Sequence, residues 1–411
     1  MRILVQKFGG TSVADVECMK QVRHKAVAAL ERGYKLVVVV SARSGHTNSL
    51  YELAAQYSSA PDAAEEDALV AVGEQMSASL FAMMLRDTGI KARSMFGWQA
   101  PVRTDAAYGQ ARILSIDGDN LRRTLETYDV VVMAGFQGVS EDNRVTTLGR
   151  GGSDTSAVAV AAALGSVECE IYTDVDGVYT TDPRICSTAR KLDRISYDEM
   201  LEMASLGAKV LQIRSVGFAK KYKVPVHVRS TFSDLPGTMV TQGDSMMEAA
   251  LVSGIAYDQD QARVTLISVP DRPGVSAAIF TPLAEAGILV DMIVQKASRD
   301  NTTDLTFTIS RKELKRTLPI MKDVCKAIGG SGMEYADNVA KVSAVGVGMR
   351  NHSGVAAKAF TALSAEGINI LMISTSEIKI SCLIEEKYLE LAVRTLHDAF
   401  ELGKSPANAA E

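Results

Sequence analysis

The chain has 411 residues, of which 47% are hydrophobic and 23% charged, and its formal net charge is −5. This length suits two or three domains, and the composition supplies enough apolar side chains for sizeable cores. Basic and acidic residues are interspersed without a long basic run, which argues against nucleic acid or an anionic membrane as the main partner. The five cysteines are scattered and include no CxxC pair. That distribution argues against a disulfide framework or a structural zinc site and favours a reducing compartment.

The apolar segments of the chain do not predict a membrane protein. The N-terminus reaches Lys7 before an apolar core long enough for a signal peptide has formed. Apolar runs such as 36–40 and 130–134 are far too short to cross a bilayer and are typical of buried strands. We therefore expect a cytoplasmic protein with no membrane partner.

Residues 1–245 alternate short Val- and Ile-rich runs with longer amphipathic stretches. The runs are expected to be strands at 3–5, 36–40, 130–134, 171–173 and 226–228. The amphipathic stretches are expected to be helices at 16–32, 66–86 and 155–164. This alternation predicts an α/β domain with a mostly parallel sheet covered by helices. Because ligands of such sheets bind at the carboxyl ends of the strands, the loops that leave the strands are the candidate sites.

A turn-rich segment closes this part of the chain at 234–245, and a duplicated unit follows it. Residues 274–293 align without a gap with residues 354–373, and ten of the twenty positions are identical. Such agreement indicates a duplicated small module, although two copies are too few for a solenoid. The predicted domains are 1–245, 246–336 and 337–411.

Two glycine-rich loops precede predicted helices in the first domain. They are Lys7-Phe-Gly-Gly-Thr-Ser12 and Gly149-Arg-Gly-Gly-Ser-Asp-Thr155. Glycines let the backbone approach an anion closely, and the N–H groups at a helix start then face it. Each loop alone is also explained by an ordinary turn between a strand and a helix, and Ser153 or Asp154 is also explained as a helix cap. Two such loops, with Lys7 and Arg150 adding positive charge, favour a ligand rich in phosphate or carboxylate.

An acidic loop and a helical glutamate are the other polar features of the first domain. The segment 172–179 has aspartates at Asp174 and Asp176 but lacks the glycine position and the closing glutamate of a calcium loop. A tight turn after a strand remains the alternative for both aspartates. Glu74 lies in a helical stretch, where a solvated surface charge is the ordinary outcome. The histidines show no metal-ligand spacing.

Taken in order, these motifs resemble those of the aspartate kinases. The matching segments are Lys7–Val13, Ala134–Val139, Thr146–Asp154, Thr173–Tyr179, Asp182–Arg184 and Gly207–Val210. The duplicated module is similar to the paired ACT domains of these enzymes, so the resemblance covers nearly the whole chain. It implies an α/β fold of the amino-acid-kinase type, an αβα sandwich with a mostly parallel sheet. Two α+β ACT modules of the βαββαβ type would follow, as in the monofunctional form without a homoserine dehydrogenase domain.

The resemblance implies transfer of the ATP γ-phosphoryl group to the β-carboxylate of L-aspartate, the first step toward lysine, threonine and methionine. Mg²⁺ would arrive with ATP, without a metal site in the protein. The residues implied around ATP are Lys7, Gly9, Gly10, Thr173, Asp174, Tyr179, Arg184 and Lys209. Those implied around aspartate are Ser41, Thr47, Glu74, Arg150 and Ser153, with Glu74 on the α-ammonium and Arg150 on a carboxylate. The implied catalytic residues are Lys7, Asp154 and Lys209, with Asp154 orienting Lys7 and not acting as a base.

For the ACT modules the resemblance implies feedback inhibition by lysine, threonine or both. The implied contacts are Asp271, Gly274, Val275, Asp291 and Gln295 in the first module, and Val355, Asn369, Ile370 and Ser376 in the second. Core packing remains the alternative for Val355 and Ile370. The modules would join chains into a homo-oligomer, and they are free to exchange strands, so 251–257 need not belong to the module that it precedes. An ACT-only subunit is open if translation starts at Met246 or Met247.

Two departures and two alternatives stay open. Arg43 stands where aspartate kinases more often have an uncharged residue, and His46 is a variable place, so the geometry around Thr47 is in question. One alternative is another amino-acid kinase, acting on acetylglutamate, glutamate or carbamate. The other is a sensor that binds amino acids without turnover.

Overall fold

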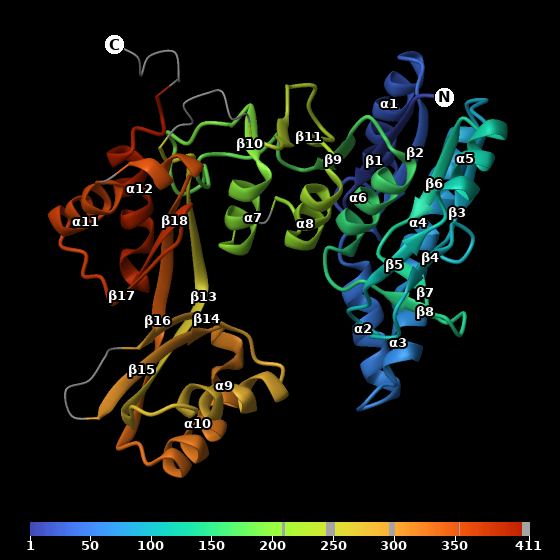
Figure 1. Cartoon of the computed structure of the whole chain (residues 1–411). Helices are drawn as coiled ribbons and strands as arrows, with labels where there is room; N and C mark the ends of the chain where they lie inside the picture. Colours follow the sequence, from blue (N-terminus) through green and yellow to red (C-terminus); the bar gives the residue numbers. More distant parts are fainter. Residues whose placement is uncertain (208–209, 244–250, 296–300, 353, 405–411) are drawn as a thin grey trace. The chain divides into compact units, whose positions relative to one another are not determined.

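The computed structural model describes residues 1–207, 210–243, 251–295, 301–352 and 354–404. The chain forms two compact units, coloured by sequence in Figure 1. The first unit contains Met1–Val178, Lys191–Ala204 and Lys209–Met246, and the second contains Tyr179–Arg190, Ser205–Ala208 and Met247–Glu411. The predicted boundary at 245/246, and the start sites Met246 and Met247, lie outside the described residues.

An eight-stranded sheet forms the centre of the first unit. In sheet order its strands are β10 (Arg194–Ser196), β12 (Thr238–Thr241), β11 (Val226–Ser230), β9 (Cys169–Thr173), β1 (Ile3–Phe8), β2 (Lys35–Val40), β6 (Val130–Ala134) and β3 (Ala92–Met95). Neighbouring strands are parallel except for the pair of β11 and β12. The neighbouring strands β2 and β6 are apolar on both sides, as expected of strands covered by helices on both faces.

Helices cover both faces of this sheet. They are α1 (Val16–Glu31), α2 (His46–Tyr57), α3 (Ala63–Val70), α4 (Val72–Arg86), α5 (Gly118–Thr127), α6 (Gly152–Leu164), α7 (Tyr197–Ser205) and α8 (Ile213–Tyr222). Apolar residues of α1 and α4 pack on the face that carries Leu4 and Phe8. Helix α6 packs on the opposite face, against β1, β2 and β9, and is flanked by α5 and α8. This is the αβα sandwich that the sequence predicted.

The helical stretch Ala63–Arg86 is long and apolar enough to cross a membrane by length and composition alone. Half of its most apolar window is buried inside the protein. Phe81 and Leu85 belong to the core against the sheet, and the stretch carries the buried carboxylates of Asp67 and Glu74. A core helix of a globular domain accounts for these contacts. The helix breaks at Ala71, where the sequence predicted one continuous stretch over 66–86.

A smaller four-stranded sheet lies in the same unit. Its order is β5 (Ile113–Ile116), β4 (Val102–Thr104), β7 (Gln137–Val139) and β8 (Val145–Thr147). The sequence did not predict these strands, since each is only three or four residues long and strand periodicity needs a longer window. Strand β8 leads directly into the second glycine-rich loop, so this small sheet carries one edge of the candidate site.

The second unit is built on one antiparallel six-stranded sheet. In order its strands are β14 (Val290–Gln295), β15 (Thr302–Ile309), β13 (Gly254–Pro270), β16 (Gly332–Val345), β18 (Lys379–Glu385) and β17 (Met372–Thr375). Its helices are α9 (Val275–Glu285), α10 (Leu314–Ile328), α11 (Val355–Ala365) and α12 (Leu389–Ala399), with short 3-10 turns η1 (Arg311–Glu313), η2 (Val347–Asn351) and η3 (Glu386–Tyr388). Helices α9 and α11, which come from the duplicated sequence, have the same length of 11 residues.

Two long strands, β13 and β16, are shared between the modules. The later part of β13 pairs with β15 and contributes Val264 and Leu266 to a core with α9 and α10. Its first residues pair with the end of β16, and Ile255 belongs to the other core, with α11 and α12. The segment 251–257 therefore serves the module that it does not directly precede, as the sequence suggested.

Candidate active site

The carboxyl end of β1 places Lys7 on the face of the sheet that α6 covers. Residues alternate between faces along a strand, so Leu4 and Phe8 turn toward α1 and α4 while Lys7 turns toward α6. The Lys7 Nζ lies 2.6 Å from Oδ1 of Asp154, and both side chains are about nine-tenths buried. Asp154 is the third residue of α6, whose N-cap is Gly151. It is therefore not the helix cap that the sequence left open, and its carboxylate is available for the lysine.

Glu74 is buried, in contrast to the solvated position expected of a helical glutamate. It lies in the first turn of α4 and is 3% exposed. Its Oε1 accepts a hydrogen bond of 2.9 Å from the backbone N–H of Ala42, whereas Oε2 has no hydrogen-bond partner among the described residues. Burial raises the pKa of Glu74 to about 7, against the lowering effect of the Ala42 amide. A buried carboxylate oxygen without a donor fits a cationic ligand.

Arg150 lies between two glycines in the left-handed region, Gly149 at φ 81° and Gly151 at φ 75°. A side chain at Gly151 would come within 2.6 Å of Gln212, so the loop needs glycine there for space as well as conformation. The Arg150 side chain is exposed and donates from Nη2 to Oδ1 of Asn48 at 3.2 Å. Its guanidinium therefore keeps donors available for a carboxylate.

These side chains line one hollow of about 430 Å³ in the first unit. From the predicted site residues it contains Lys7, Gly10, Ser41, Thr47, Glu74, Arg150, Ser153 and Asp154. It also contains Ala42, Arg43, Ser44, Gly45, Asn48, Tyr51, Phe136, Gly151 and Gly152. The hollow thus presents three cationic side chains, two carboxylates and several hydroxyl groups at the ends of β1 and β2 and at the start of α6, where the sheet topology predicts a ligand.

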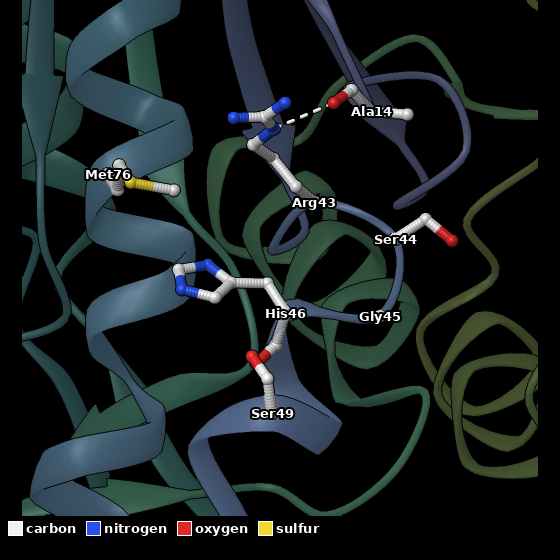
Figure 2. A pocket seen from close by; sticks show the side chains of 7 residues that line it. All are labelled: Ala14, Arg43, Ser44, Gly45, His46, Ser49 and Met76. Atoms are coloured by element: carbon white, nitrogen blue, oxygen red, sulfur yellow. Dashed lines mark hydrogen bonds between the residues drawn. The ribbon is translucent and has the colours of Figure 1, made fainter. Parts of the chain in front are cut away.

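A second hollow, of about 370 Å³, adjoins the first one at the 43–45 loop. Figure 2 shows its lining, in which the Arg43 side chain points toward the carbonyl of Ala14 and away from Ser49. The Arg43 Nε donates to the Ala14 oxygen at 2.7 Å. The charged residue that distinguishes this loop is therefore tied to the backbone of a neighbouring loop.

The remaining predicted nucleotide contacts are more dispersed. Gly9 donates its amide to the carbonyl of Tyr172 at 3.3 Å, which joins the first glycine-rich loop to the end of β9. Thr173 and Asp174 leave β9 beside that loop, and the Thr173 hydroxyl lies 3.0 Å from the Asp174 carboxylate. Tyr179 and Arg184 belong to the second unit, and Lys209 lies outside the described residues.

Within the described residues, one group of side chains has donor atoms placed for a metal ion. It consists of Glu168, Glu170 and His227, whose donor atoms lie within 4.8 Å of one another. Glu170 is fully buried, and its carboxylate already accepts hydrogen bonds from the Tyr172 hydroxyl and the Arg229 guanidinium. Because a fixed cation neutralises Glu170, we interpret the group as a compensated charge network on the sheet.

The predicted effector contacts all fall in the second unit. Gly274 and Gly354 are the N-caps of α9 and α11, with φ of 93° and 104°, as expected of duplicated modules. Val275 and Val355 are buried in the two cores, so packing accounts for both. Asp291 in β14 is exposed and contacts the buried ammonium of Lys341. The other predicted contacts are Asp271, Gln295, Asn369 and Ser376, which are exposed, and Ile370, which is half-buried.

Two polar residues of the hollow, Asn48 and Tyr51, received no role from the sequence. Tyr51 follows Thr47 by one helical turn in α2, so both point from the same face of this helix into the hollow. The spacing of four residues from Thr47 was the feature of the sequence that could have identified Tyr51 as a site residue. Asn48 touches Arg150 across 102 positions of sequence, and no local pattern indicates such a contact.

Comparison with known proteins places this site in a family. A model of the amino acid kinase family matches residues 2–230, and ACT domain models match residues 263–326 and 342–400. An aspartokinase of Pseudomonas aeruginosa is 54% identical over 413 residues, and an aspartate kinase of Stutzerimonas stutzeri is 53% identical over 412 residues. Both alignments cover 100% of each chain. The chain belongs to the aspartate kinase family.

Solved structures of this family have the same fold. Aspartokinase III of E. coli in complex with aspartate and ADP is 29% identical, with a TM-score of 0.80. The same enzyme in complex with lysine and aspartate is 28% identical, with a TM-score of 0.77. Each match covers 97% of this chain and 99% of the other. The protein is therefore a kinase of the aspartate kinase family, with an amino-acid-kinase domain and two ACT domains, as the sequence predicted.

Proposed function

We propose that this protein transfers the γ-phosphoryl group of ATP to the β-carboxylate of L-aspartate and forms 4-phospho-L-aspartate. One observation carries the proposal. The hollow that holds the Lys7–Asp154 pair also holds a buried glutamate with an unpaired oxygen and an exposed arginine. Glu74 suits an ammonium group and Arg150 suits a carboxylate, so together they suit the backbone groups of an amino acid.

The chemistry asks little of the protein beyond charge and alignment. The aspartate β-carboxylate is already ionised at neutral pH, so its attack on phosphorus needs no general base. The bond from phosphorus to the leaving ADP oxygen breaks as the new carboxylate–phosphorus bond forms, and no proton is transferred. The Lys7 ammonium would neutralise charge on the γ-phosphoryl oxygens, the backbone N–H of Gly10 would donate a hydrogen bond to them beside Gly9, and Mg²⁺ bound to ATP would add to this effect. Asp154 would hold the Lys7 ammonium in place.

Regulation by lysine, threonine or both forms part of the proposal. The two ACT domains and the E. coli relative solved in complex with lysine and aspartate support it. In the first module, Asp291 already pairs with the Lys341 ammonium, so an effector ammonium would have to replace or share this contact. The proposed effector contacts are the exposed and half-buried residues named from the sequence, without Val275 and Val355, whose side chains pack in the two cores. A homo-oligomer through the ACT domains, an additional ACT-only subunit and a cytoplasmic location stay predictions.

Two other functions make different demands on the hollow. A kinase for acetylglutamate or carbamate has no substrate ammonium for Glu74 to bind, and burying this carboxylate would then be a cost without a ligand. The substrate of a glutamate kinase carries the same α-ammonium group as aspartate, so only an experiment distinguishes this function from the proposed one. A sensor without turnover would not need Lys7 paired at the start of α6.

The test is ATP turnover with Mg²⁺, in which hydroxylamine traps the acyl phosphate as its hydroxamate. Parallel reactions contain L-aspartate, L-glutamate or N-acetyl-L-glutamate, each with and without lysine plus threonine. We expect hydroxamate with aspartate alone, and less of it when both effectors are present. Hydroxamate with another acid in place of aspartate would assign a sister kinase, and ligand binding without turnover would assign a sensor. Aspartate turnover at the same rate with and without both effectors would refute only the regulatory part of the proposal.

A further inference from the structure

The loop that carries Arg150 has little rigidity of its own. Glycines flank Arg150 on both sides, and the Arg150 side chain is exposed, with Asn48 as its partner. A glycine-flanked residue loses more conformational freedom on ordering than most. An arginine that recognises a carboxylate must nevertheless be held to within a fraction of an ångström. The preceding residues, Thr147 and Leu148, are both buried and are where the loop is anchored.

A buried carboxylate holds this anchor from one side. Asp67 of α3 is 2% exposed. It accepts hydrogen bonds from the Thr147 N–H at 2.7 Å and from the Thr147 hydroxyl at 2.6 Å. It also accepts from the N–H of Gly109, at 3.0 Å to each oxygen. Among the residues that the structure describes, no cation forms an ion pair with Asp67, so these neutral donors compensate its charge.

A guanidinium holds the same anchor from α8. Arg214 donates from Nη1 to the carbonyl of Leu148 at 2.6 Å and from Nη2 to the carbonyl of Ala111 at 2.9 Å. Burial lowers the pKa of Arg214, which remains a cation at any physiological pH. The fixed fork of a guanidinium therefore sets the spacing of two backbone segments.

The two segments are also bonded to one another. The Ala111 N–H donates to the carbonyl of Thr147 at 2.8 Å. A Cβ at Gly149 would lie 3.1 Å from the carbonyl oxygen of Gly109, so the backbones run close together at the start of the loop. Asp67 and Arg214 thus clamp one small backbone layer from two helices, and this layer ends one residue before Arg150.

We propose that Asp67 and Arg214 are positioning residues for substrate recognition: they fix the backbone at 147–149 so that Arg150 meets the substrate carboxylate. The proposal rests on the proposed function, since it takes Arg150 as the residue that binds aspartate. Neither residue lines the hollow, and neither would touch the substrate. Their effect should therefore fall on aspartate and not on ATP.

Substitutions at Asp67 separate a positioning role from general stability. Asp67→Ala removes all the acceptors and leaves the Gly109 and Thr147 donors unsatisfied. Asp67→Asn can keep the network, because its oxygen accepts from both backbone N–H groups while its NH₂ donates to a reoriented Thr147 hydroxyl. Asparagine should therefore rescue what alanine loses. At the other helix, Arg214→Gln removes at least one of the two bonds to carbonyl oxygens.

The experiment measures steady-state kinetics of the full chain for both substrates. We expect Asp67→Ala to raise KM for aspartate about 30-fold and Arg214→Gln about 10-fold, which correspond to one or two lost hydrogen bonds. KM for ATP should stay within about twofold, and Asp67→Asn should lie within about threefold of the wild type for both substrates. Equal increases in both KM values, or an asparagine variant as impaired as the alanine variant, would overturn the proposal.

Hydrogen–deuterium exchange of peptides covering 145–152 gives a readout that does not depend on activity. Exchange should accelerate in Asp67→Ala and Arg214→Gln and return to the wild-type rate in Asp67→Asn. Unchanged protection in both damaged variants would contradict the clamp even if KM rose. A wild type without aspartate turnover would refute the proposed function, and the exchange data would still decide whether the clamp exists. If Asp67→Ala fails to fold, Arg214→Gln and Thr147→Val carry the same comparison.

Discussion

The charged side chains are paired with each other at one end of the hollow and unpaired at the other end. At the β1 end, Lys7 and Asp154 neutralise each other at 2.6 Å. At the other end, Oε2 of Glu74 has no hydrogen-bond partner in the described part of the chain, and Arg150 is exposed with only a neutral amide beside it. The first end keeps a cation in a fixed place without a ligand. The second end keeps two opposite charges for a ligand that would bring both counter-charges.

Under the proposed function, this difference separates the residues for catalysis from those for substrate recognition. A preorganised cation lowers the energy of a transition state because it need not move as charge develops. An uncompensated buried carboxylate destabilises the folded chain until a ligand pairs with it. Substitutions at the Lys7 end should therefore lower the rate of the chemical step. Substitutions at the Glu74 end should change substrate affinity, and a substitution of the buried Glu74 should change stability as well. Substitutions at four residues test this contrast.

Lys7→Ala should have the largest effect. Removal of one preorganised electrostatic donor lowers kcat by roughly 10²–10³, and the buried Asp154 loses its partner. Lys7→Ala/Asp154→Asn should regain stability in thermal unfolding but not kcat, because the asparagine no longer needs a cation. The control is Lys20→Ala, since Lys20 is an exposed lysine that pairs with neighbouring Glu17. A Lys7→Ala enzyme with near-normal kcat would remove Lys7 from the mechanism.

Arg150→Gln should act on affinity. Loss of a charged hydrogen bond to a carboxylate corresponds to about 10- to 100-fold in KM for aspartate. KM for ATP and the melting temperature should change little, because Arg150 is exposed and, within the described residues, forms a hydrogen bond only with Asn48. Asn48→Ala is the matched control and should give a smaller increase, since the guanidinium remains. A fall in kcat at saturating aspartate with an unchanged KM would assign Arg150 to the phosphoryl end instead.

The raised pKa of Glu74 predicts a pH dependence of aspartate binding. Only the ionised carboxylate attracts an ammonium group, and burial raises the pKa of Glu74 to about 7. KM for aspartate at saturating ATP should therefore rise as the pH falls below 7, by about tenfold per unit well below the pKa. Glu74→Gln should remove this dependence. His46 lies near α4, so His46→Gln serves as the control and should keep the wild-type profile.

The Glu74 carboxyl also makes the stability of the folded chain depend on pH, and stability should fall as the pH rises. Its folded pKa of about 7 lies above the unfolded value of 4.5, so the unfolded chain loses this proton first as the pH rises. Stability should fall between these values by up to about 3 kcal/mol. Glu74→Gln should consequently raise the melting temperature at pH 8 more than at pH 5. An equal change at both pH values would show that Glu74 is not the buried, unpaired acid of this structure.

Local sequence patterns predicted both glycine-rich loops that line the hollow, which carry Lys7 and Arg150, but not the burial of Glu74. Lys7 and the glycines lie in one short segment at a strand-to-helix junction, where local rules suffice. Burial of Glu74 was not predictable from its own helix, because it depends on the 41–45 loop that covers it. The clamp on the Arg150 loop was missed for the same reason, since Asp67 and Arg214 act across 80 and 66 positions of sequence. Contacts between segments so far apart leave no periodic signal in one chain.

Substitution of Arg43 should have the smallest effect. The sequence left open whether this charged residue changes the geometry around Thr47. Its guanidinium donates to the Ala14 carbonyl at the edge between the two hollows (Figure 2). An exposed hydrogen bond of this kind stabilises little, and Glu74 and Arg150 keep their own contacts without it. Arg43→Met should change KM for aspartate by less than about threefold. A tenfold increase in KM for aspartate would show that Arg43 takes part in substrate binding together with Glu74 and Arg150.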